Sequence, residues 1–229
     1  MSNPRSSAPY LDGIRGVAAF LVFVHHFLLV FYTSTYTGIA TSSKLNNLDT
    51  IYGLSPFSVL TNGNFWVHVF FTLSGFVLSR KYIRTNDTTL LVSGMHRRFI
   101  RLFIPVAVSL LLVYVMMTVN AFSNVKVASI TGSEWWFSHM WHFDAPIPKL
   151  LNCLFYSTMF QGDSIYNTVL WTISFELYGS LFVFAFLLFT HSVGYRPLLL
   201  FIVFIYFYYS NQSAYVSFVS GIYLAMLEQ

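Results

Sequence analysis

Three ionisable side chains lie in or beside the first long apolar run of the chain, where ionisable groups are rare. Arg15 opens the run, and the adjacent His25 and His26 lie within it. An ionisable group inside a bilayer-length segment is costly, so it usually serves a function. Arg15 and His26 are eleven residues apart. That spacing is about three helical turns, so both side chains share one helix face, roughly 16 Å apart along the axis.

This spacing predicts a site with His26 near the middle of the bilayer and Arg15 near the membrane–water interface. His25 points about 100° away from His26, so adjacency alone gives the two rings no shared role. The alternative is that His26 only bonds a neighbouring helix while Arg15 reaches the lipid headgroups.

Arg97, Arg98 and Arg101 form a second group of candidates, ahead of the third long apolar run. Arg98 and Arg101 are three residues apart and share a helix face. Guanidinium groups bind phosphate oxygens through a planar pair of donors. The cluster therefore predicts a site for a phosphorylated ligand. The alternative is that these charges set the membrane topology and contact lipid headgroups.

Glu176 is a further ionisable residue inside an apolar run, at 169–189. Such a carboxyl must pair, become protonated or face water. His26, His68 or an arginine are its candidate partners. In the second apolar run, Gly75 predicts the close approach of another helix, because a small residue lets two backbones come together.

The composition indicates an integral membrane protein. Of the 229 residues, 56% are hydrophobic and 9% are charged, against about 25% charged in soluble domains. So few charges do not cover a water-facing surface. The net charge of +4 comes without the mixed basic and aromatic tracts of nucleic-acid-binding proteins, so no nucleic-acid partner is predicted. A single Cys153 and the absence of a third ligand beside His139 and His142 predict no metal site.

The apolar runs predict an all-α fold, a polytopic transmembrane helix bundle of about five or six spans. We expect a disordered N-terminus at 1–9 and a single membrane domain at 10–229. The expected spans are 14–32, 65–78 with its flanks, 102–120, 169–189, 198–209 and 215–227. Pro105 would lie in the first turn of the third span, where its missing N–H is tolerated.

The distribution of basic residues predicts the orientation. Half of the 12 Lys and Arg residues lie between 79 and 102. By the positive-inside rule this connection is cytoplasmic, and the N-terminus, two spans earlier, is cytoplasmic too. The membrane that holds the protein is not predicted.

Four motifs occur in one order along the chain, at 11–19 followed by His26, at 70–76, at 98–101 followed by Pro105, and at 171–176. Together they resemble the motifs of the acyltransferase-3 family of multispanning membrane acyltransferases. The resemblance implies transfer of an acyl group, often acetyl, from an acyl-CoA donor to a hydroxyl of a carbohydrate, lipid or small-molecule acceptor. Family members have more spans, so the resemblance also implies that this chain is C-terminally incomplete.

The resemblance gives the candidate residues chemical roles. His26 would take the proton of the hydroxyl as it attacks the thioester. Arg15 would bind the donor or stabilise developing negative charge, and Glu176 would orient the histidine or line the site. Arg98 and Arg101 would hold the phosphates of coenzyme A.

Arg97 would assist Arg98 and Arg101 in binding these phosphates. Acyl-CoA is therefore expected as a donor substrate, and no bound cofactor is expected. Membrane lipid surrounds the bundle in this interpretation. Two other functions remain open from the residues alone. Intramembrane His, Glu and Arg also suit a proton-coupled transporter or translocator, and a truncated bundle would be non-catalytic.

Overall fold

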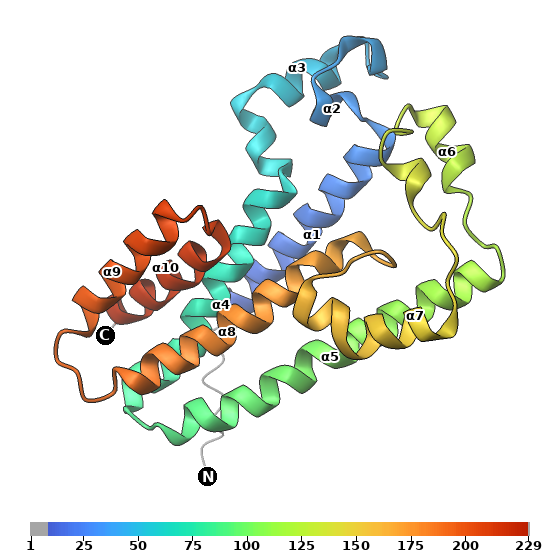
Figure 1. Cartoon of the computed structure of the whole chain (residues 1–229). Helices are drawn as coiled ribbons and strands as arrows, with labels where there is room; N and C mark the ends of the chain where they lie inside the picture. Colours follow the sequence, from blue (N-terminus) through green and yellow to red (C-terminus); the bar gives the residue numbers. More distant parts are fainter. Residues whose placement is uncertain (1–8, 229) are drawn as a thin grey trace.

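The computed structural model describes residues 9–228, and every regular element in that part is helical (Figure 1). The predicted all-α fold is therefore confirmed. The predicted disordered segment 1–9 lies outside the described residues except for Pro9, where the first helix begins. The longer helices are α1 (Pro9–Phe31), α4 (Gly63–Thr85), α5 (Thr89–Thr118), α8 (Trp171–Phe189), α9 (Arg196–Tyr209) and α10 (Ser213–Leu227).

Short helices fill the connections that the sequence suggested were loops. After α1 come α2 (Ser34–Thr37), η1 (Ala40–Ser42), α3 (Leu48–Leu54) and η2 (Pro56–Thr61). Between α5 and α8 come α6 (Asn124–Thr131), η3 (Phe137–His139), α7 (Ile147–Asn152), the π-helix η4 (Cys153–Gln161) and η5 (Thr168–Leu170). Figure 1 shows α2 and α3 beyond the C-terminal end of α1, at the end of the molecule opposite the α4–α5 connection.

Three helical stretches in the described part are long and apolar enough to cross a membrane, at Tyr10–Phe31, Thr89–Thr118 and Thr168–Phe189. The helix α4 has 23 residues but ends in Arg80, Lys81 and Arg84. The helices α9 and α10 have 14 and 15 residues, fewer than the roughly 20 that a full span needs. The larger expected number of spans therefore depends on α4 and on the α9–α10 hairpin.

The structure corrects the third span, because α5 begins at Thr89 and not at 102. The basic cluster is helical, and the α4–α5 connection shrinks to 86–88. Pro105 is in the interior of α5, where it lacks the N–H that would donate to the carbonyl of Arg101. The sequence interpretation placed the basic residues between 79 and 102 in a loop because they are charged. Arg98 can instead occupy a helix in the bundle because it has a carboxylate partner there.

The helix α4 is the central element and packs against α1, α8 and α10 (Figure 1). Its contact with α10 is backbone to backbone. A Cβ added to Gly75 would lie 2.2 Å from the backbone oxygen of Phe218, and one added to Gly221 would lie 2.2 Å from that of Thr72. The predicted close approach at Gly75 is confirmed. This packing fixes the face that α4 turns to α5 and α8.

Gly75→Ala is expected to destabilise the protein by about 1–3 kcal/mol, because the added methyl overpacks a helix contact that has no space for it. Gly16→Ala is the matched control, since among the described residues no atom outside its own helix turn lies within 4 Å of a Cβ at that position. Thermal unfolding of the detergent-solubilised chain, followed by tryptophan fluorescence, measures both variants. Equal melting temperatures for the two would contradict the close contact.

Candidate functional site

The ionisable residue of α8 pairs with the basic cluster of α5. Arg98 and Glu176 form an ion pair, and each side chain is 14% exposed. The hydroxyl of Ser74, on α4, donates to Glu176 Oε1 at 2.5 Å, and Arg98 Nε donates to Ser180 Oγ at 2.9 Å. The predicted partner of Glu176 is therefore an arginine and not His26 or His68. The pair and its two hydroxyls tie together α4, α5 and α8.

The surroundings of this pair carry excess positive charge. The charges of Arg15 and Arg101 both act on Arg98, while Glu176 supplies one compensating negative charge. Asp12 is 3.8 Å from Arg15, but its side chain is 72% exposed, where solvent weakens the attraction. The fold thus places Arg15, from the first predicted group, where its charge acts on Arg98 of the second group. An excess of guanidinium groups suits a multiply charged anion.

A cavity of about 340 Å³ lies between α4, α5 and α8 beside this cluster. All three predicted phosphate-binding residues, Arg97, Arg98 and Arg101, line it. Lys81, from the end of α4, lines it too. The sequence interpretation left Lys81 out of the site, although it belongs to the same basic stretch. The cavity is at the small end of the range for ligand sites.

His26 lies further along α1, and its surroundings fix its tautomer. Its Nδ1 is 2.8 Å from the carbonyl oxygen of Val22, one turn earlier. A carbonyl oxygen only accepts, so Nδ1 carries the proton and Nε2 of the neutral ring keeps a lone pair. This is the form that can take a proton from a ligand. In the described part of the chain, no hydrogen bond or ion pair joins His26 to Glu176.

The tryptophan-rich segment after α6 lies beside His26 and reaches His25 through Tyr36. The ring of Trp136 lies 6.4 Å from that of His26, and Trp135 stacks on Tyr36 with an interplanar angle of 7°. The side-chain amide of Asn124 holds this segment, because its two N–H donors lie within hydrogen-bond distance of three backbone carbonyls. The segment therefore shields His26 on one side.

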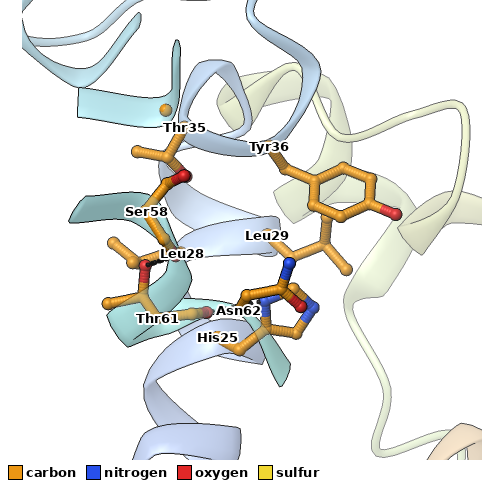
Figure 2. Close-up of a pocket in the computed structure, with 9 residues that line it drawn as sticks. His25, Leu28, Leu29, Thr35, Tyr36, Ser58, Thr61 and Asn62 are labelled. Atoms are coloured by element: carbon orange, nitrogen blue, oxygen red, sulfur yellow. Dashed lines mark hydrogen bonds between the residues drawn. The ribbon is translucent and has the colours of Figure 1, made fainter. Parts of the chain in front are cut away.

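His25 faces a second, polar pocket of about 140 Å³ (Figure 2). Its walls come from α1, α2, α3, η2 and the N-cap residue of α4. The lining residues are His25, Leu28, Leu29, Thr35, Tyr36, Gly53, Ser58, Thr61 and Asn62. The sequence interpretation missed this pocket, because it took His25 only as a ring pointing away from His26. The Thr, Ser and Asn residues of 33–62 were the available signal, but their convergence depends on the fold.

The chain resembles known acyltransferases over most of its length. Residues 8–229 match the model of a family described as an acyltransferase domain. The chain is also 25% identical over 205 residues to O-acetyltransferase PaAT-1 of Phomopsis amygdali, an alignment that covers 80% of this chain and 40% of that protein. The chain thus spans well under half the length of this curated relative. No solved structure matches it.

Proposed function

The chain belongs to the acyltransferase-3 family, and from this premise we propose that the protein is a membrane O-acyltransferase using acyl-CoA, first of all acetyl-CoA, as donor. The acceptor is a hydroxyl compound. The observation that carries the proposal is the basic cavity lined by Arg97, Arg98 and Arg101. The charge of Arg15, on the helix that bears His26, acts on Arg98. The basic ends of α4 and α5 face the cytoplasm in this proposal, as does the N-terminus.

The basic cavity suits the phosphates of the donor. Coenzyme A carries several phosphate charges, and guanidinium groups bind such oxygens in pairs. The cavity is too small for a whole coenzyme, so the phosphate end binds there and the thioester arm extends past Arg15. It then follows α1 over roughly 16 Å to His26.

The transfer step requires a base at the end of this path. Nε2 of His26 takes the proton of the acceptor hydroxyl as its oxygen attacks the thioester carbonyl carbon. The new C–O bond forms, the C–S bond breaks, and the proton passes to the leaving thiolate. Arg15 is too far from His26 to touch the developing oxyanion, so donor binding is its favoured role. Glu176 acts indirectly, by holding Arg98 in place.

Arg101→Gln is expected to raise the KM for acetyl-CoA by roughly 10- to 100-fold with a smaller change in kcat, because it removes a charge-assisted bond of about 1.5–3 kcal/mol. The measurement is transfer of radiolabelled acetyl groups from acetyl-CoA to a crude extract by the solubilised chain. Arg84→Gln is the control, since Arg84 pairs with Glu228 outside the cavity.

The outcomes separate the candidate functions. An unchanged KM for acetyl-CoA in Arg101→Gln would show that the cavity is not the donor site. Coenzyme A binding without any labelled product would favour a transporter or a non-catalytic bundle over an enzyme.

A further inference from the structure

Two adjoining pockets lie at the end of α1 opposite the basic cavity. The first is the polar pocket of Figure 2. The second has a volume of about 310 Å³ and lies next to it. They share three wall residues, Leu28, Thr35 and Thr61. A ligand with two chemically different ends could therefore occupy both.

The polar pocket offers hydrogen-bond acceptors to a ligand. His25 Nδ1 lies 3.0 Å from the carbonyl oxygen of Thr61, so it donates there and Nε2 of the neutral ring remains an acceptor. The hydroxyls of Thr35 and Ser58 donate to the carbonyls of Tyr32 and Ser55, at 2.7 and 2.8 Å. Both keep free lone pairs on their oxygen atoms. The pocket therefore suits a hydroxyl that donates.

Among the described residues that line the polar pocket, none is an aspartate, glutamate, lysine or arginine. A charged ligand would leave water without a compensating charge there, which is costly. The ligand end that enters is therefore neutral. The volume of about 140 Å³ admits only a small group, on the scale of a cavity that holds one benzene ring.

The neighbouring pocket has a largely apolar wall, made by Leu28, Leu45 and Leu48 with the rings of two tyrosines, Tyr32 and Tyr52. One carboxylate, that of Asp49, also belongs to the wall.

The carboxylate of Asp49 accepts hydrogen bonds from neighbouring residues of the chain. The hydroxyl of Ser43 donates to its Oδ1 at 2.5 Å, and the N–H of Lys44 donates to its Oδ2 at 2.8 Å. Burial raises the pKa of Asp49, but these hydrogen bonds outweigh it and hold that pKa well below its usual range. The carboxylate thus fixes the 43–49 turn, and a hydrocarbon group faces mainly leucine and ring carbon.

We propose that the two pockets together bind the acceptor, and that the acceptor is a neutral amphipathic alcohol. Its hydroxyl bonds His25 and its hydrocarbon body fills the cavity lined by Leu28, Leu45 and Leu48. The proposal rests on the proposed function, which supplies the reaction. The ring centroids of His25 and His26 are 5.3 Å apart, so the proposed acceptor site lies one ring away from the base.

This arrangement disfavours a carbohydrate acceptor. A sugar carries hydroxyls on all sides, and those facing the leucine-lined cavity would lose water without gaining partners. An alcohol with a single polar end places every polar group in the polar pocket. The structure thereby narrows the acceptor classes that the sequence left open.

The first test is photolabelling, which needs no turnover. The probe is 1-decanol carrying an alkyl diazirine, and mass spectrometry of the whole solubilised chain maps the labelled residues. We expect labelling of α1 and of 45–52, competed by 1-decanol and much less by decane. Leu48→Trp should lower the labelling at least tenfold. Leu54→Trp is the matched control, because Leu48 and Leu54 are both exposed leucines of α3, at 66% and 74%, and only Leu48 lines the cavity.

The second test measures acetyl transfer to 1-decanol and to methyl glucoside. We expect His25→Ala to raise the KM for 1-decanol at least tenfold and to leave the KM for acetyl-CoA unchanged. Competed labelling without any transfer would support the pocket and count against the proposed function. Transfer that favours methyl glucoside, or is equal in Leu48→Trp and Leu54→Trp, would overturn the acceptor assignment while leaving the acyltransferase function standing.

Discussion

Arg98→Ala is expected to lower the free energy of unfolding by about 3–5 kcal/mol. The substitution leaves the carboxylate of Glu176 largely buried without its positive partner, and removing one member of a buried ion pair costs that much. Ser74 would remain as a donor to Glu176, but one neutral hydroxyl does not replace a guanidinium. Thermal or chemical unfolding of the solubilised chain measures the effect.

A paired comparison separates the ion pair from a general effect of losing an arginine. Arg84→Ala removes an arginine whose ion pair with Glu228 is more exposed, at 47% and 27%, and such pairs contribute little. The double variant Arg98→Met with Glu176→Leu should recover most of the lost stability, because neither charge remains buried. It should still fail to bind coenzyme A. Equal losses in Arg98→Ala and Arg84→Ala would contradict the buried pair.

His26→Ala is expected to lower kcat for acetyl transfer by about 10²- to 10⁴-fold, the range for loss of a positioned general base. Folding should change little, because the hydrogen bond that the imidazole makes within the described part of the chain goes to the carbonyl of Val22 in its own helix. The KM for acetyl-CoA should hold, since the proposed donor site is about three turns away. Steady-state transfer of labelled acetyl groups and a melting curve measure the two properties.

A second histidine, His96, has the same hydrogen-bond geometry as His26 and serves as the control. His96 of α5 is exposed, and its Nδ1 faces the carbonyl of Val92 one turn earlier at 3.1 Å, as His26 faces Val22. His96→Ala should therefore leave transfer intact. Full activity in His26→Ala would exclude it as the base, and a comparable loss in both variants would point to a general effect of histidine removal.

The sequence by itself determined the helical class, most of the long helices and the family. Hydropathy and helical period are properties of about twenty successive residues, so α1 and α8 could be predicted from their own segments. The placement of Arg15 and His26 on one helix also needed only their spacing. The small side chain of Gly75 predicted a close helix contact without identifying the partner.

Only the tertiary structure decided which side chains meet. Glu176 had three candidate partners, and the rotation of α5 against α8 selected Arg98. The same pairing explains why the basic cluster is helical and not a loop. His25 gained its polar pocket from residues 35–62, and His26 its cover from Trp136. These contacts join segments far apart in the chain, and they depend on helix rotation and packing, which local sequence patterns do not encode.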